Sequence, residues 1–241
     1  MSKPKKPVHT LSLPYPDPPW PSVSADQEQA ILRLLLPLLQ PIGEFRRDYI
    51  PQSKGRGRAG KTHKTENGSV PEWMPELYNH LTIGFNSTVR RLESLAHTRK
   101  PANIALTTSN PPGKPEINLS VVFVCRQNLP DIMISSLPLL MATSAPKSNR
   151  SKLVELTSQA EAKIALALQQ PRVGVLGCEE GAPGAETLLR FVSEMVDAVD
   201  VSWLEQPGNP VYYPAKVKTT EVEAKDKATA RKLKRKNSEE G

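Results

Sequence analysis

The residues best suited to chemistry lie in one short segment, where a predicted strand passes into a predicted helix. The strand, residues 81–84, ends at Gly84, whose missing side chain allows another backbone to come close. We expect Asn86 to cap the helix, whose first turn then presents polar side chains on Ser87, Thr88, Arg90 and Arg91. Together with free backbone N–H groups, these side chains suit the phosphates and base edges of RNA. An ordinary capped helix with solvated arginines is the alternative.

A second segment, residues 55–62, matches the phosphate-loop pattern GxxxxGK[ST]. That loop works only between a buried strand and a helix N-terminus, and here Pro51 precedes it and no apolar helix follows. We therefore expect no nucleotide binding. A flexible Arg/Gly/Lys segment that contacts RNA phosphates is predicted instead, with a solvated loop as the alternative. The residues expected to contact RNA in and next to this segment are Lys54, Arg56, Arg58 and Lys61.

Nothing in the sequence predicts catalysis, a cofactor or a metal site. The four histidines lack metal-ligand spacing, and no nucleophile elbow or oxyanion turn frames a Ser/His/Asp grouping. The two cysteines, Cys125 and Cys178, exclude a disulfide scaffold and are typical of a reducing compartment. The longest apolar run, residues 31–42, is too short and too interrupted to span a membrane, so no membrane partner is expected.

Positive charge is concentrated at the two ends of the chain. Residues 1–71 carry 11 Lys and Arg against six acidic residues, and residues 205–241 carry nine against six. Between them, residues 72–204 carry 12 against 13. A neutral body with basic extensions is typical of a protein that binds an acidic polymer, with nucleic acid well ahead of an anionic membrane.

Composition divides the chain into five segments. The first 21 positions hold seven prolines, which indicates an extended, disordered arm over residues 1–25. Residues 26–50 are predicted to form a first helix, stopped by Pro41, and a short strand at 45–50. The remaining segments are a basic flexible loop (51–70), an RNA-binding core (71–204) and a basic disordered tail (205–241) whose cluster at 231–236 predicts nuclear localisation.

Short strand and helix patterns alternate along the predicted core. Residues 121–125 form an unbroken apolar run, which is typical of a strand buried on both faces. Further strands are predicted at 104–107, 153–156 and 173–176, and helices at 86–95, 131–142, 160–168 and 185–199. This alternation predicts an α/β protein: a three-layer α/β/α sandwich over a mixed, mainly four-stranded sheet, with disordered basic extensions.

The segment Gly84-x-Asn86-x-Thr88-x-Arg90 resembles the signature G-x-N-E-x-T-K of the kink-turn-binding ribosomal-protein superfamily. The similarity continues in order over about residues 77–200, and includes an "LPLL" helix at 137–140. With the Pro-rich arm, the basic insertion and the tail, the chain is similar to the Pop-three family of fungal RNase P and RNase MRP subunits.

The resemblance implies a noncatalytic RNA-binding subunit of RNase P and RNase MRP, nuclear and nucleolar, that supports tRNA 5′ maturation and rRNA processing. Its expected partners are the RNA and the other protein subunits. The implied RNA contacts are Gly84, Asn86, Ser87, Thr88, Arg90 and Arg91, with Gln169 and Gln170 in a second loop. Ser87 stands where the family usually has glutamate, which leaves open whether the RNA is a true kink-turn. A protein–protein scaffold with little RNA contact is the alternative function.

Overall fold

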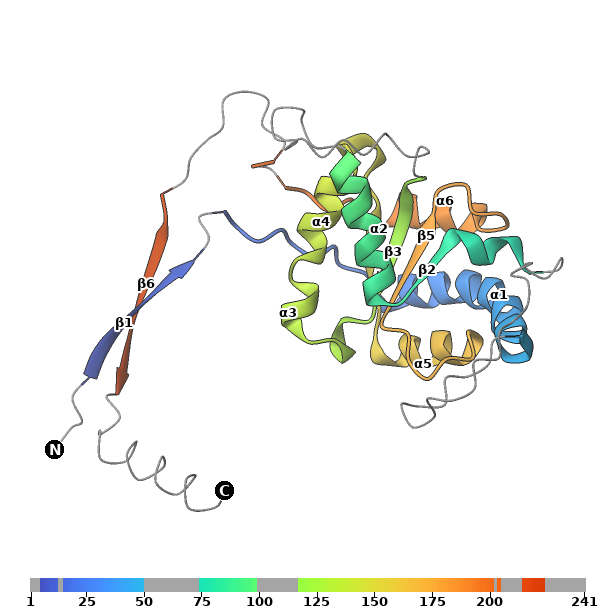
Figure 1. Ribbon diagram of the computed structural model, residues 1–241, viewed down its shortest axis with the longest axis horizontal. Helices are drawn as coiled ribbons and strands as arrows, with labels where there is room; N and C mark the ends of the chain where they lie inside the picture. Colours follow the sequence, from blue (N-terminus) through green and yellow to red (C-terminus); the bar gives the residue numbers. More distant parts are fainter. Residues whose placement is uncertain are drawn as a thin grey trace, which may run out of the picture. The chain divides into compact units, whose positions relative to one another are not determined.

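The structure is a computed structural model, and it describes residues 5–12, 15–49, 74–98, 117–201, 203–204 and 214–223. The chain forms two units: the larger runs from Pro18 to Val201, and the smaller combines Met1–Asp17 with Ser202–Gly241 (Figure 1). The predicted basic loop at 51–70, the predicted strand at 104–107 and the basic cluster at 231–236 lie outside the described residues.

The larger unit is built on a mixed four-stranded sheet with the strand order β2-β5-β3-β4. Strands β3 and β4 are parallel, whereas β5 is antiparallel to both β2 and β3. The strands are β2 (Leu81–Ile83), β3 (Leu119–Val124), β4 (Lys152–Glu155) and β5 (Val175–Glu179).

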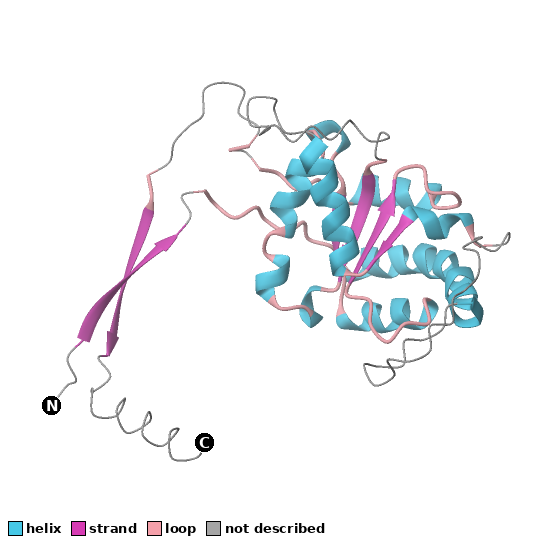
Figure 2. Cartoon of the chain, viewed as in Figure 1, coloured by secondary structure: helices cyan, strands magenta, loops and turns pink. Residues whose placement is uncertain are grey.

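Helices cover both faces of this sheet, with α1, α5 and α6 on one face and α2 with α4 on the other (Figures 1 and 2). Their bounds are α1 (Ala25–Tyr49), α2 (Phe85–Thr98), α3 (Asp131–Ile134), α4 (Leu137–Ser144), α5 (Ser158–Ala167) and α6 (Glu186–Met195). Short 3-10 turns occupy Glu76–His80, Arg126–Asn128 and Lys147–Asn149. The predicted α/β sandwich over a mixed four-stranded sheet is therefore confirmed.

Strand β3 separates two hydrophobic layers. Val121 and Phe123 belong to the core that α1, α5 and α6 close. Val122 and Val124, also fully buried, point to the opposite face, because successive side chains of a strand alternate. The unbroken apolar run that predicted a strand buried on both faces is confirmed.

Helix α1 continues through two prolines, so the predicted stop at Pro41 and the predicted strand at 45–50 are wrong. An interior proline removes a helical hydrogen bond and costs about 3 kcal/mol. The apolar face nevertheless keeps its helical period past both Pro37 and Pro41. Its buried side chains include Leu35, Leu39, Ile42 and Phe45. Packing of this long face against α5 and α6 therefore overrides the local preference to stop.

Two smaller boundaries also differ from the sequence prediction. The helix predicted over 131–142 is divided into α3 and α4 at residues 135–136, and Pro138 sits in the first turn of α4, where a missing N–H costs nothing. The strand predicted over 173–176 is β5, which runs from Val175 to Glu179, so Gly177 lies inside it. A Cβ at Gly177 would overlap the hydroxyl of Thr82 on β2, so this glycine lets a polar side chain lie against the strand.

The smaller unit contains an antiparallel pair of strands, β1 (Lys5–Ser12) and β6 (Lys216–Glu223). The predicted disorder of the arm and the tail is therefore wrong for these two segments. Strand β6 has four β-branched residues among its eight and β1 has two. Pro7 is tolerated in β1 because each strand of a two-stranded pair has an unpaired edge. In the same unit, the rings of Tyr15 and Trp203 lie 4.5 Å apart.

No helix among the described residues is long and apolar enough to cross a membrane.

The crossing of α1 and α5 depends on Gly43, because an added Cβ there would overlap the backbone carbonyl of Ala167. A backbone atom cannot rotate away, so we expect Gly43→Ala to lower the free energy of unfolding by about 2 kcal/mol despite the better helix propensity of alanine. Denaturant unfolding measures the change. Gln40→Ala, on the exposed side of the same helix, is the control and should change stability by less than about 0.5 kcal/mol. A Gly43→Ala protein as stable as the parent would show that the helices can separate without cost.

Burial raises the pKa of the Cys125 and Cys178 thiols to about 12. Neighbouring carboxylates, those of Glu161 and Glu179, add to this effect. Only the thiolate attacks, and at pH 8 this rise in pKa lowers the thiolate fraction on the order of 1,000-fold. Because a more basic thiolate is also a better nucleophile, both cysteines should react on the order of 100-fold more slowly in the folded protein than in denaturant. A chromogenic disulfide reagent measures both rates. A thiol that reacts in the folded protein as fast as in denaturant would contradict the burial seen here.

Candidate nucleic-acid interface

The candidate site lies where three strands of the sheet begin or end. The N–H of Gly84, directly after β2, donates to the carbonyl of Val175 at the start of β5 (2.8 Å). The N–H of Cys125, directly after β3, donates to the carbonyl of Gly174 (2.8 Å). We call this boundary of the sheet, together with the first two turns of α2, the α2 edge.

Gly84 forms the turn into α2, and its backbone conformation requires glycine there. Its φ of 93° is a value that other residues rarely adopt. Its carbonyl accepts the N–H of Thr88 (3.2 Å), the first helical hydrogen bond of α2. Gly84 therefore occupies the cap position and Asn86 lies inside the first turn, so the predicted capping role of Asn86 is wrong. Among the described residues other than its chain neighbours, nothing lies within 4 Å of the position that a Cβ of Gly84 would take, so the need for glycine comes from its φ and not from crowding within the chain.

Three of the predicted site residues are exposed on the α2 edge: Asn86, Ser87 and Arg90. Within the part of the chain that the structure describes, none of these side chains has a hydrogen-bond or ion-pair partner. Arg90 also lines an open hollow of about 380 Å³ with Glu93, Ser94 and His97. These three side chains are therefore available to bind a ligand.

Thr88 supports the turn from inside. It is fully buried, and its hydroxyl lies 3.1 Å from the Gly84 carbonyl and 3.0 Å from the Thr82 hydroxyl. A residue with no exposed surface cannot contact RNA in this conformation, so the prediction of a direct contact by Thr88 is corrected to a structural role.

Arg91 is fixed against the sheet. Its guanidinium donates to Glu179 Oε1 (2.7 Å) and to the Ile117 carbonyl (2.9 Å). The other oxygen of Glu179 lies 3.2 Å from His80 Nδ1. The Glu179 side chain is only 11% exposed, so its charge offsets that of Arg91 at short range. Arg91 is thus a weaker candidate for RNA contact than Arg90.

The electrostatics of the α2 edge favour an anion. The N-terminus of a helix carries a partial positive charge and unsatisfied N–H groups. The first turns of α1, α3, α5 and α6 contain carboxylates, whereas those of α2 and α4 contain none. Arg90 adds a full positive charge one turn into the helix. These features together make the α2 edge a suitable surface for phosphate.

The second predicted loop shares this boundary of the sheet but faces the opposite helix layer. Gln170 faces the guanidinium of Arg46 near the end of α1. Gln169 lines a hollow of about 460 Å³ between α1 and α5. The structure records no contact between these glutamines and the start of α2, so it does not bring together the two predicted contact regions.

Sequence reasoning missed two arginines at the same boundary. Arg172, in the loop before β5, is exposed, and no partner is recorded for it among the described residues. Its position directly after the predicted loop was a usable signal. Arg126 follows β3 and lies 3.6 Å from Glu155 and 5.0 Å from the centre of the Trp20 ring. Those contacts are long-range in sequence and gave no signal.

The predicted loop contacts Lys54, Arg56, Arg58 and Lys61 lie outside the described residues. Within the described ranges, no group of three or more His, Cys, Asp or Glu side chains is arranged to hold a metal ion.

Comparison with known proteins places this fold in a family. The family model of the RNase P subunit Pop3 matches residues 68–206, which is more than half of the chain. The matched range contains all four strands of the larger sheet and the whole α2 edge. No curated protein matches the chain. The chain therefore belongs to the Pop3 family, whose members are accessory protein subunits of the tRNA-processing ribonucleoprotein RNase P.

Proposed function

We propose that this chain is a noncatalytic RNA-binding subunit of RNase P and RNase MRP, and that the α2 edge contacts their RNA. One observation carries the proposal: Asn86, Ser87 and Arg90 are exposed and have no described partner, beside a helix N-terminus that lacks carboxylates.

Each side chain of the α2 edge has a distinct capacity. The Asn86 amide both donates and accepts, so it suits a base edge. The Arg90 guanidinium is a planar donor fork that suits a phosphate or a guanine edge. Ser87 offers one hydroxyl, a weaker acceptor than the glutamate usual at this position of the superfamily. The surface therefore supports phosphate binding together with limited base recognition.

Further contacts belong to the same proposal. We assign auxiliary, sequence-independent phosphate contacts to Lys54, Arg56, Arg58 and Lys61, and to the cluster at 231–236 both such contacts and nuclear import. Gln169 and Gln170 would contact RNA that extends past the α2 edge. The proposed roles are tRNA 5′ maturation within RNase P and rRNA processing within RNase MRP, in the nucleolus.

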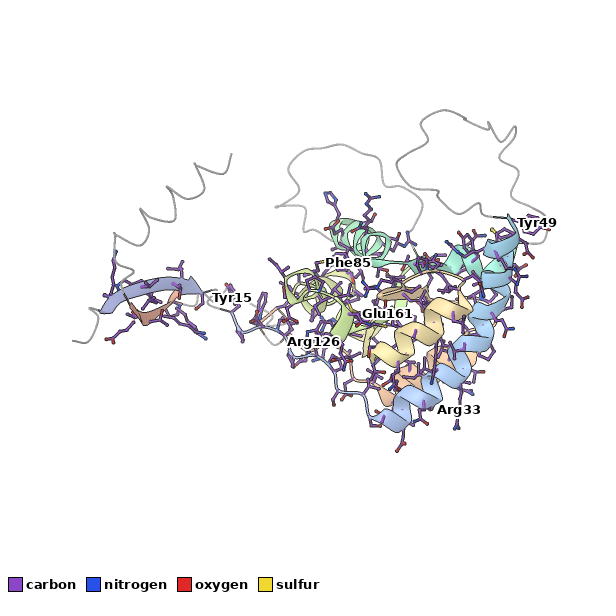
Figure 3. The ribbon with its side chains drawn as sticks, turned by 90° about the horizontal axis from the view of Figure 1, so that it is seen from below. Tyr15, Arg33, Tyr49, Phe85, Arg126 and Glu161 are labelled. Atoms are coloured by element: carbon purple, nitrogen blue, oxygen red, sulfur yellow. The ribbon has the colours of Figure 1, made fainter. Side chains whose placement is uncertain are left out.

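Arg90→Ala and Asn86→Ala should each weaken binding of RNase P RNA about tenfold or more, because a hydrogen bond to a charged group contributes about 1.5–3 kcal/mol. Neither change should lower the melting temperature, since both side chains are exposed and Asn86 is not the cap. Filter binding at two salt concentrations, with cognate and scrambled RNA, measures the effect. Arg33→Ala is the charge-matched control, because Arg33 lies on α1 in the opposite helix layer (Figure 3).

The neighbouring arginine gives a second comparison. Arg91→Ala leaves Glu179 without its closest cation, and we expect it to lower the free energy of unfolding by about 1–3 kcal/mol.

If the Arg90 and Asn86 variants bind cognate RNA as the parent does, the α2 edge is not the RNA site. Retained assembly with the protein subunits would then favour the scaffold function.

A further inference from the structure

The pairing register of β1 and β6 sorts their side chains onto two faces. Lys6 lies opposite Val222, Val8 opposite Thr220, Thr10 opposite Lys218 and Ser12 opposite Lys216. Because side chains alternate along a strand, all eight of these residues share one face. We call it the lysine face. The alternate pairs, including His9 with Thr219 and Leu11 with Val217, share the other face.

The lysine face carries three positive charges and no carboxylate. Lys6, Lys216 and Lys218 are all exposed, and none of them has an ion-pair partner in the described parts of the chain. Glu221 pairs with Pro7 and therefore lies on the other face. The pairing register therefore places the lysines and the Glu221 carboxylate on opposite faces of the ribbon, and the net charge of either terminus does not show this.

The hydroxyls on the lysine face are already used within the ribbon. Thr10 donates to the Lys218 carbonyl, Ser12 to the Lys216 carbonyl and Thr220 to the Val8 carbonyl. They stiffen the ribbon but are not free donors. Recognition by this face therefore depends on the lysines, which favours a ligand of dense negative charge over one with a specific hydrogen-bond pattern.

The dimensions of the face fit a nucleic-acid duplex. Lys216 and Lys218 are two residues apart, about 7 Å, and Lys6 pairs with a residue four positions beyond Lys218, about 13 Å further. Over this length of about 20 Å a duplex presents on the order of ten phosphates. The major groove of A-form RNA is deep and narrow, so the ribbon would contact the phosphate backbone and would not enter that groove. Alone it would be marginally stable, so a bound partner would stabilise it.

We propose that the lysine face of the β1–β6 ribbon binds the phosphate backbone of double-stranded RNA, as a second RNA-binding surface that is separate from the α2 edge. RNA is the expected partner because the chain belongs to a family of subunits of an RNA-containing complex. The three lysines, which have no ion-pair partner among the described residues, complement the negative charge of its phosphates. Binding here is independent of base sequence, because lysine ammonium groups contact phosphates as point charges.

The test uses the full chain and a 20-base-pair RNA duplex without loops or bulges. In the triple variant Lys6→Gln, Lys216→Gln, Lys218→Gln, we expect duplex affinity to fall on the order of tenfold near 0.1 M salt. The slope of log affinity against log salt should become shallower by about two to three units. The triple variant with arginine at the same three positions keeps the charges and should retain both affinity and slope.

A charge-matched control removes three positive charges from the larger unit: Arg33→Gln, Lys147→Gln and Lys152→Gln. Its slope should change by less than one unit. The α2-edge variants Asn86→Ala and Arg90→Ala should alter discrimination between cognate and scrambled RNA, whereas the ribbon glutamine variant should lower affinity for both RNAs by the same factor, so the two proposals fail separately. If the ribbon glutamine variant keeps the parent's slope of log affinity against log salt, this proposal is overturned. Equal losses in the glutamine and arginine variants would also overturn it, as would a loss confined to assembly with protein subunits.

Discussion

Strand β5 is hydrogen-bonded on both sides, to β2 and to β3, and every residue in it is buried. The start of the strand fixes the turn into α2, because the Val175 carbonyl accepts the N–H of Gly84. The end of the strand fixes α2 two turns later, because Glu179 binds Arg91. The first two turns of α2 are therefore held at two points by the most deeply buried strand of the sheet. Exposed side chains between those points are presented from a rigid support, which specific binding requires.

Two adjacent arginines on α2 have opposite environments for a simple geometric reason. Successive residues of a helix are separated by about 100°, so Arg90 and Arg91 cannot face the same neighbour. Arg91 reaches Glu179 at the edge of the sheet, while Arg90 points to solvent with no described partner. One arginine thus stabilises the site and the other is available to a ligand. The composition of the segment contains both charges but does not distinguish their roles.

The layers of the fold could be predicted from short-range patterns, since periodicity and apolar runs report burial directly. The continuous apolar run predicted β3, and apolar residues at helical spacing predicted α6. The errors have a different origin. Helix α1 passes Pro41 because its packing partners lie more than 100 residues away, and β1 pairs with β6 across some 200 residues. Asn86 has the residue type of a helix cap, but the helix starts one residue earlier, after Gly84 with its positive φ. Of the candidate site, the segment was predictable, but which of its side chains are buried was not.

Pairing of the two ends of the chain changes what their charge can do. Lysines in an unpaired segment attract phosphates wherever the chain happens to lie, and each must lose its own conformational freedom on binding. In the ribbon, the register holds Lys6 on the same face as Lys216 and Lys218, although they are more than 200 residues apart in sequence. Strand pairing therefore removes part of the conformational freedom of the lysine backbone before any ligand binds. The same register places Glu221 on the other face. A patterned charged surface therefore arises from two segments whose individual compositions indicate only a basic arm and a basic tail.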